Sequence, residues 1–310
     1  MTDARAMVAD GPVHHPSHAT DVAALIRESG TGGRTLRIRG AGTWMDAGHS
    51  VRAAATLTLD AMRGIIGYRP DDLTISVGAG TTLAELDEAT RAHGQWCPLL
   101  PWGDDTGTVG ATVATATSGP FAERLGRPRD LVLGLECVDG TGRVIAAGGK
   151  VVKNVAGFDL TRAVTGSWGT LAVITQLHLR LRARPTVDET WALSPPNGED
   201  AAVVTFDRGH FAPLAALAVS EADASALALG GARWLVRIGG NAAFVAAARD
   251  ALRAIGDSVA VDPAVWDDVR TRLAPPARAI RWRWDALSSR LRERFDPARV
   301  LNPGLLGEPA

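Results

Sequence analysis

The sequence predicts an α+β protein of about two domains. Three observations support this prediction. Short apolar strands end in glycine-rich turns in the first half, a stretch of small residues runs from Pro101 to Pro120, and Ala-rich helices alternate with strands after Pro185. With 310 residues the chain is also long enough to bury a sizeable core.

The composition is that of a soluble globular protein, with 46% hydrophobic and 22% charged residues. The net charge of −1 provides no basic field, which argues against binding to nucleic acid. Cys97 and Cys137 stand far apart without a CxxC motif or a Cys/His cluster, which argues against a metal site and suits a reducing compartment. No stretch resembles a signal peptide or a membrane span, so we expect a cytoplasmic protein that does not insert directly into a membrane.

The first elements lead to a glycine-rich turn. Thr20 is expected to cap a helix over residues 21–29, and Gly30 is expected to end it. A strand over residues 35–39 then runs into Gly-Ala-Gly-Thr at positions 40–43. A strand that ends in such a turn can present backbone N–H groups to a phosphate, although the same turn could equally be a hairpin corner.

The next elements exclude one nucleotide-binding motif. Strands are predicted over residues 56–59 and 73–77, followed by Gly-Ala-Gly at 78–80 and a helix over 83–93. The third glycine position of GxGxxG is occupied by Leu83, and no acidic residue ends a following strand at the expected distance. A dinucleotide site of the Rossmann type is therefore not expected here.

The central feature is the small-residue stretch, in which every residue from Thr106 to Gly119 is Gly, Ala, Ser, Thr or Val. No long side chain separates this backbone from a neighbouring group, and the N–H groups of residues 108–111 could form an anion nest. Hydroxyl groups would add further hydrogen-bond donors. The stretch is typical of a cradle for a nucleotide cofactor, and the alternative is a packing seam between elements.

The rest of the first domain is predicted as a hairpin, a short helix and two strands. Strands over 131–137 and 143–147 flank Asp-Gly-Thr-Gly at 139–142, a strong hairpin signal. Residues 171–174 and 177–181 are expected to be separate strands. Pro185 then marks a boundary.

Beyond Pro185 we expect a small α+β cap. Its helices are predicted over 211–229 and 242–255, and its strands over 202–206 and 233–238. A further strand is expected over 280–284, followed by an apolar helical stripe that Asp296-Pro297 ends. The predicted units are residues 1–184, 185–278 and 279–310, the last packing back on the first.

Four segments together resemble a known family. They are RIRGAGT at 37–43, TVGATVATATSGP at 108–120, KNVAGFDL at 153–160 and LNPG at 301–304. They resemble the vanillyl-alcohol-oxidase or PCMH-type family of FAD-binding proteins, and within it the FAD-binding subunits of bacterial glycolate oxidases. The resemblance implies an FAD-binding domain of two α+β lobes with the cofactor between them.

The resemblance also implies which residues contact FAD. The turn after the first long strand would hold the pyrophosphate, the small-residue stretch would line the ribityl chain and the isoalloxazine, Ile174 would meet the adenine end through its backbone, and Asn302 would lie near the flavin ring. Relatives with covalent FAD carry a His in the first turn, so the sequence GAGTWMD implies noncovalent FAD. The residues carried over are Arg39, Gly40, Ala41, Gly42 and Thr43 for the pyrophosphate, and Pro101, Thr108, Gly110, Ala111, Ala114, Thr117, Ser118 and Gly119 for the rest of the cofactor.

Catalytic members of the family differ from this chain in two respects. They are expected to hold the substrate carboxylate with an Arg and a Thr where this sequence has Val152 and Ala156, and their cap carries a His-rich metal cluster. From residue 186 onward this chain has a single histidine, His210, which cannot form a metal site alone. Lys150 or Lys153 could supply the cation for a carboxylate, or could be solvated loop charges, and no base is evident.

The resemblance therefore implies an FAD-carrying subunit of a glycolate oxidase complex, which oxidises a small 2-hydroxy acid to the 2-oxo acid. Its implied partners are a paralogous FAD-binding catalytic subunit and an iron–sulfur subunit, through which it could sit peripherally at the inner membrane. Two alternatives remain open: a self-sufficient FAD-dependent 2-hydroxyacid dehydrogenase, and a scaffold that has lost FAD.

Overall fold

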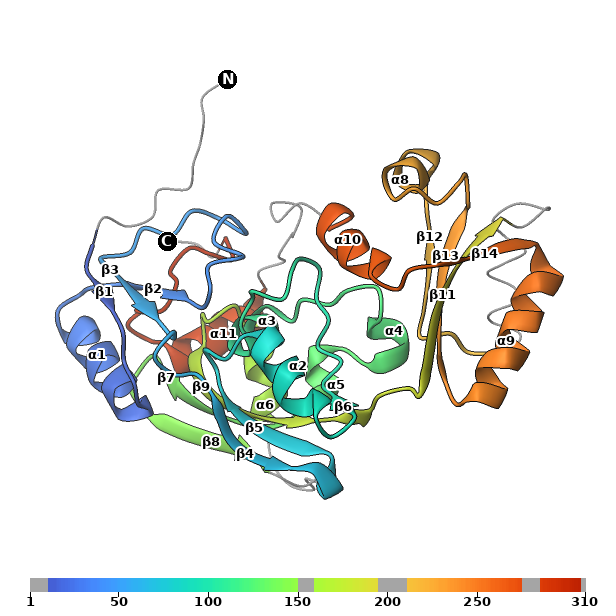
Figure 1. Ribbon diagram of the computed structural model, residues 1–310. Helices are drawn as coiled ribbons and strands as arrows, with labels where there is room; N and C mark the ends of the chain where they lie inside the picture. The colour runs from blue at the N-terminus through green and yellow to red at the C-terminus, as the bar shows by residue number, and fades with distance from the viewer. Residues whose placement is uncertain (1–10, 150–158, 195–210, 275–284, 308–310) are drawn as a thin grey trace.

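The computed structural model describes residues 11–149, 159–194, 211–274 and 285–307. Within these ranges the chain forms a larger body, with two main sheets and one two-stranded sheet, and a smaller body built on a single sheet, and the two bodies lie side by side (Figure 1). None of the described helices combines the length and the apolar character needed to cross a bilayer.

The first sheet carries the glycine-rich turn at the end of one strand. It has the order β1 (Val13–His14), β3 (Ala55–Thr58), β2 (Leu36–Arg39), and both pairings are parallel. Helix α1 (Ala19–Thr31) lies beside it (Figure 1) and buries Val22 and Ile26. The helix begins after His18 rather than Thr20, because the Asp21 carboxylate accepts the His18 N–H at 3.0 Å. It also continues past Gly30, which packs near Val300.

The second sheet is antiparallel, and its strands share the large apolar core with α1, the first sheet and the short helices. Its order is β4-β5-β9-β7-β8. The predicted hairpin at 139–142 is confirmed, because the Asp139 carboxylate accepts the Thr141 and Arg143 N–H groups at 3.0 Å each. Two predicted strands form one continuous strand, β9, and β4 was not predicted. The bounds are β4 (Ile65–Arg69), β5 (Thr74–Gly78), β7 (Val132–Asp139), β8 (Val144–Gly148) and β9 (Ala172–Arg180).

Short helices cover this sheet on the side of the first sheet (Figure 1). The predicted helix after Gly80 is confirmed as α2, and its Thr82 side chain caps it by accepting the Glu85 N–H at 3.2 Å. A Cβ on Gly80 would lie 1.9 Å from the Leu59 carbonyl oxygen, so this glycine permits close backbone packing. The elements are the 3-10 helix η1 (Pro70–Asp72), α2 (Leu83–Arg91), α3 (Val109–Thr115), α4 (Ala122–Leu125), α5 (Pro128–Leu131), α6 (Leu160–Val164) and the paired short strands β6 (Gln95–Trp96) and β10 (Arg182–Ala183).

The smaller body is a four-stranded antiparallel sheet in the order β12-β13-β11-β14. The predicted helix over 211–229 is wrong: β12 occupies its middle, because the Ala-rich segment pairs with β13 over Ala215–Ala218. The predicted strand over 202–206 lies outside the described residues. The bounds are β11 (Val187–Ser194), β12 (Ala215–Ala218), α8 (Glu221–Ala226), β13 (Trp234–Gly240), α9 (Ala242–Ile255), β14 (Asp257–Val261) and α10 (Val265–Arg272).

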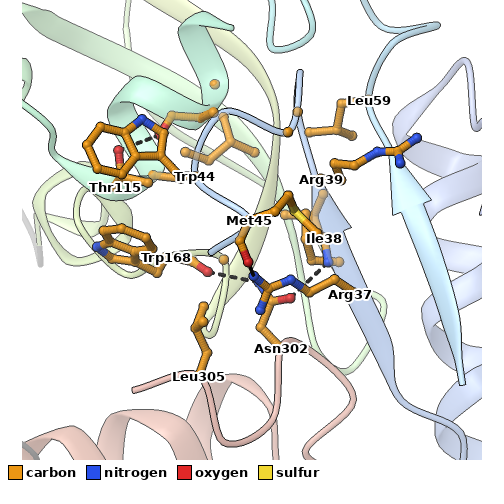
Figure 2. A pocket seen from close by; sticks show the side chains of 18 of the residues that line it. Arg37, Ile38, Arg39, Trp44, Met45, Leu59, Thr115, Trp168, Asn302 and Leu305 are labelled. Atoms are coloured by element: carbon orange, nitrogen blue, oxygen red, sulfur yellow. Dashed lines mark hydrogen bonds between the residues drawn. The ribbon is translucent and has the colours of Figure 1, made fainter. Parts of the chain in front are cut away.

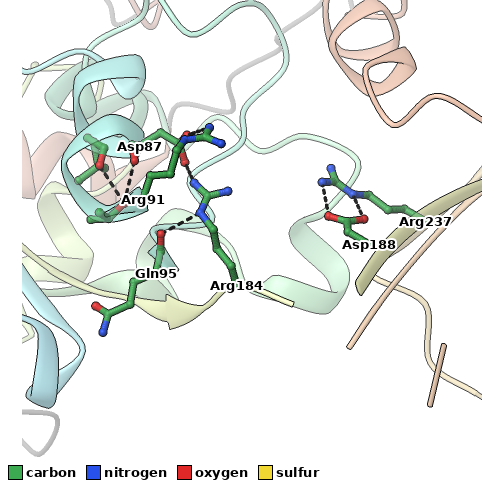
Figure 3. A network of polar contacts seen from close by, with 8 residues as sticks. Asp87, Arg91, Gln95, Arg184, Asp188 and Arg237 are labelled. Atoms are coloured by element: carbon green, nitrogen blue, oxygen red, sulfur yellow. Dashed lines mark hydrogen bonds and ion pairs between the residues drawn. The ribbon is translucent and has the colours of Figure 1, made fainter. Parts of the chain in front are cut away.

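Arginine ion pairs hold the chain near the junction of the two bodies. Arg184 forms an ion pair with the Asp87 carboxylate and donates to the Gln95 carbonyl at 3.0 Å (Figure 3). In the sheet of the smaller body, Arg237 forms a bidentate ion pair with Asp188 at 2.9 and 2.7 Å (Figure 3). The junction lies between β10 and β11, close to Pro185. The unit boundaries 1–184, 185–278 and 279–310 stay predictions.

The end of the chain returns to the first sheet. Helix α11 (Ala286–Phe295) ends before Asp296 as predicted, but its apolar stripe is not a buried face, since Leu287 is 57% exposed and the buried residue is Arg292. Leu301 then bridges Leu36 in parallel. The predicted strand over 280–284 lies outside the described residues. The last described segment thus lines the edge of β2.

Candidate functional site

A pocket lies where β2 ends, between α3, the turn at 166–169 and the C-terminal segment (Figure 2). The space it encloses, counted with the part open to solvent, is about 660 Å³. A second pocket of about 650 Å³ adjoins it at Thr43, Trp44 and Ala111.

The two pockets bring together ten of the predicted site residues. The first is lined by Arg39, Gly40, Gly42, Thr43, Gly110, Ala111, Ala114, Ile174 and Asn302, and the second adds Pro101. The predicted residues Ala41, Thr108, Thr117, Ser118 and Gly119 line neither of them. Segments far apart in the sequence thus meet around one space, as the resemblance implied, but the small-residue stretch contributes only part of its length.

The 40–43 turn offers free backbone donors. Within the described chain, the N–H groups of Gly40, Ala41, Gly42 and Thr43 donate no hydrogen bond to another residue. The turn stands outside any strand or helix and is at most partly buried. Gly42 adopts φ 89°, a left-handed conformation that glycine accepts without strain. The turn can therefore direct several N–H groups at one anion.

The anion nest expected at residues 108–111 is wrong. The Val109 and Gly110 N–H groups donate to the Thr81 and Ala79 carbonyls at 2.8 and 2.9 Å, and the Ala111 N–H donates to the Thr108 hydroxyl at 3.2 Å. Thr108 is thus the N-cap of α3. These donors are satisfied by the protein, so the free donors lie on the 40–43 turn instead.

The glycines of both segments allow close packing. A Cβ on Gly40 would lie 2.4 Å from the Thr108 hydroxyl oxygen, and one on Gly110 would lie 2.7 Å from the Ala79 Cβ. A Cβ on Gly119 would meet the Leu100 carbonyl oxygen at 2.3 Å. These three glycines therefore allow elements of the protein to pack closely, as the packing-seam alternative predicts. Ala111 and Ala114 of the same stretch line the pocket.

The hydroxyl groups expected to serve a ligand are mostly used within the protein. The Thr115 hydroxyl donates to the Ala111 carbonyl at 2.8 Å and also bonds the Thr117 hydroxyl. The Ser118 hydroxyl donates to the Ala116 carbonyl at 3.5 Å. These side chains stabilise the end of α3, where Ala116 adopts φ 51°.

Asn302 lines the pocket as a bridge between two segments. Its Oδ1 accepts the Ile38 N–H at 2.8 Å, and its Nδ2 donates to the Trp168 carbonyl at 2.9 Å (Figure 2). Its own N–H donates to the Leu36 carbonyl at 2.9 Å. Asn302 therefore fixes β2 and the 166–169 turn relative to each other.

Several lining residues were not predicted. Trp44 and Trp168 meet edge to face, with ring centroids 6.2 Å apart, and Met45 lies beside them. Trp168 is both buried and part of the pocket wall. Arg37 also lines the pocket; its position two residues before Arg39 on β2 is the signal that could have identified it.

A buried arginine of the smaller body holds the wall of the second pocket. The Arg270 guanidinium donates to the Pro101 carbonyl at 2.9 Å and to the Asp105 carboxylate at 2.5 Å, and the Arg270 carbonyl accepts the Gly103 N–H at 2.8 Å. The loop over 101–107 is thus positioned by α10. Contacts between the two bodies therefore shape this pocket.

The structure does not place the residues that were considered for a catalytic or metal-binding role. Lys150, Lys153, Val152, Ala156 and His210 lie outside the described residues. Among the residues that are described, no group of three or more His, Cys, Asp or Glu side chains could hold a metal ion. Burial raises the pKa of the Cys97 and Cys137 thiols to about 12, so neither is a thiolate at neutral pH.

Comparisons with known proteins agree with this geometry. Residues 12–148 match the family model described as FAD binding domain. Glycolate oxidase subunit GlcE of Escherichia coli (strain K12) is 39% identical over 132 residues, 42% of this chain and 37% of that protein. A D-lactate dehydrogenase of Archaeoglobus fulgidus is 34% identical over 186 residues, 60% of this chain and 42% of that protein.

Glycolate oxidase subunit GlcD of Bacillus subtilis (strain 168) is 31% identical over 170 residues, 54% of this chain and 36% of that protein. The matches thus span less than half of the length of these relatives. Alkyldihydroxyacetonephosphate synthase has a TM-score of 0.68 at 16% identity and covers 84% of this chain and 56% of its own, which confirms the predicted α+β fold. Over residues 12–148 the chain therefore has the sequence pattern of the FAD binding domain family, as the resemblance implied, on a fold shared with that synthase.

Proposed function

We propose that this chain binds FAD noncovalently in the pocket at the end of β2, as the flavin-carrying subunit of a complex that oxidises a small 2-hydroxy acid such as glycolate to the 2-oxo acid. One observation carries the proposal. Four N–H groups of the 40–43 turn are free within the described chain, beside a pocket walled by Gly110, Ala111 and Ala114. The match to the FAD binding domain model and the names of the relatives support it.

Different residues of the chain would bind different parts of the cofactor. The 40–43 turn, with Arg39 before it, would bind the diphosphate through N–H groups. The small-residue wall of α3 would allow the ribityl chain and the flavin ring to approach closely, and Ile174 and Asn302 would complete the wall. When bound, FAD supplies the hydride acceptor for oxidation of an alcohol.

Noncovalent binding is supported by the composition of the pocket walls. Neither described pocket has a histidine or a cysteine among its lining residues. Both thiols are buried in the core and protonated at neutral pH. The described walls therefore offer neither an imidazole nor a thiol for a covalent bond to the flavin.

The complex is part of the proposal. Relatives named as glycolate oxidase subunits suggest an assembly of several chains. The partners would be a paralogous FAD-binding catalytic subunit and an iron–sulfur subunit that passes electrons onward. The chain would act in the cytoplasm, and any contact with the inner membrane would be made by its partners.

The visible absorbance of the purified chain tests the proposal. The protein would be loaded with FAD, freed of excess cofactor and recorded without oxygen before and after addition of glycolate. A flavin spectrum that remains oxidised, and that bleaches once the partner chains are added, is the expected result. Bleaching by the chain alone would favour the self-sufficient dehydrogenase, and a protein that retains no flavin would favour the scaffold.

A further inference from the structure

Arg37 is a buried cation with an unused donor. Arg37 is only 9% exposed, and its side chain extends from β2 toward Met45 and Asn302 (Figure 2). Its Nη2 donates to the Met45 carbonyl at 3.2 Å, whereas its Nη1 has no hydrogen-bond partner among the described residues. No carboxylate of the described chain forms an ion pair with it.

An unpaired buried charge is costly in the absence of a ligand. Removing a guanidinium from water carries a desolvation penalty that only an opposite charge and hydrogen bonds can offset. Burial accordingly lowers the pKa of Arg37, and no acidic neighbour counters the shift. Such an arrangement indicates that the missing partner is an anion supplied from outside the described chain.

The lining of the pocket indicates the kind of anion. Among its described lining residues the charged side chains are Arg37 and Arg39, and none is acidic. The two arginines are two positions apart on β2 and both line the pocket, with their side chains extending in different directions (Figure 2). The free N–H groups of the 40–43 turn follow directly. Two cations and several N–H donors match a group with two negative charges and many acceptor oxygens.

We propose that Arg37 binds the diphosphate of FAD, with Nη1 donating to a phosphate oxygen, together with the 40–43 turn. This inference rests on the proposed FAD-binding function and goes beyond it, because the family resemblance implied residues 39–43 alone for the diphosphate. Arg37 is then the residue that selects a phosphorylated flavin over riboflavin.

The test measures ligand binding by isothermal titration of the full-length apo-protein. FAD and ADP serve as ligands that carry the diphosphate, and riboflavin as the ligand that lacks it. Glycolate, titrated into the FAD-loaded protein, serves as the small carboxylate. The variants are Arg37→Met and Arg37→Gln, both neutral. The matched control is Arg34→Met, which removes an exposed arginine paired with Glu28 at 2.6 Å.

The neutral variants should bind FAD and ADP about 10- to 100-fold more weakly, as expected for loss of a charged hydrogen bond, while riboflavin affinity stays unchanged. The melting temperature of the apo-protein should be equal or higher, because an unpaired buried charge has been removed. Arg34→Met should match the wild type throughout. If Arg37→Met does not fold, Arg37→Gln provides the same comparison.

Three outcomes would overturn the inference. Equal weakening of FAD and riboflavin together with a lower apo-protein melting temperature would make Arg37 a packing residue. Unchanged FAD affinity with loss of glycolate binding would assign the cation to a substrate carboxylate. Unchanged affinity for every ligand would leave Arg37 without this role, whereas a wild-type protein that binds no FAD would refute the proposed function itself.

Discussion

Replacing Asn302 by glycine should strongly destabilise the protein. Asn302 adopts φ 42°, which glycine accepts without strain, so the substitution isolates the loss of the side chain. Two hydrogen bonds disappear: a part-buried one from the Ile38 N–H at 2.8 Å and a buried one to the Trp168 carbonyl at 2.9 Å. Each partner left unsatisfied costs about 1–3 kcal/mol, so the free energy of unfolding should fall by about 2–6 kcal/mol.

Urea unfolding followed by tryptophan fluorescence measures this change. The matched control is Asn241→Gly, because Asn241 caps α9 in the smaller body by accepting the Phe244 N–H, and a glycine cap costs only a few tenths of a kcal/mol. FAD affinity should also fall in the Asn302 variant alone, since the wall between β2 and the 166–169 turn is loosened. A loss of stability no larger than that of the control would refute the bridging role.

Three further predictions follow from contacts near the pockets. Gly110→Val should lower the melting temperature rather than simply exclude FAD, because its Cβ would lie 2.7 Å from Ala79 and overpacking costs about 1–3 kcal/mol; an unchanged melting curve would contradict this. Arg270→Met should increase amide hydrogen exchange across the 101–107 loop, and unchanged protection would show that the loop does not depend on α10. Cys97 and Cys137 should resist a thiol reagent at pH 8 until the protein unfolds. Because folding raises their pKa from 9.0 to about 12, stability should fall as pH rises from about 9 toward 12, by about 1.4 kcal/mol per pH unit and thiol, and the slope should be smaller by this amount in a double alanine variant.

The glycine-rich turn could be predicted from sequence because its signal is local. A strand pattern over 35–39 followed by Gly-Ala-Gly-Thr requires only neighbouring residues to be recognised, and β2 ends at Arg39 as expected. The hairpin at 139–142 is local in the same way. By contrast, the donors of residues 108–111 are taken by the carbonyls of Ala79 and Thr81, and nothing in the small-residue stretch encodes those partners.

The smaller body shows how tertiary pairing overrides local preference. The alanines of 211–229 favour a helix in isolation, yet Ala215–Ala218 pair with β13 because that strand has an open edge. Strand β4 was missed because its edge position leaves most of its side chains exposed and removes the expected apolar alternation. Arg37 was missed for a related reason, since a charged residue in a strand is usually solvated.

The arrangement of charge distinguishes a cofactor-binding chain from a scaffold. A scaffold would be more stable with an apolar residue in place of Arg37, because its buried Nη1 has no partner in the described protein. The glycines of the seam do not make this distinction, because packing against Ala79 and Thr108 accounts for them. The unpaired cation and the free N–H groups of the 40–43 turn lie on one strand and its end, and a single bound diphosphate would satisfy both. Unpaired polar groups that lower the stability of the free protein are expected where a bound ligand provides their partners.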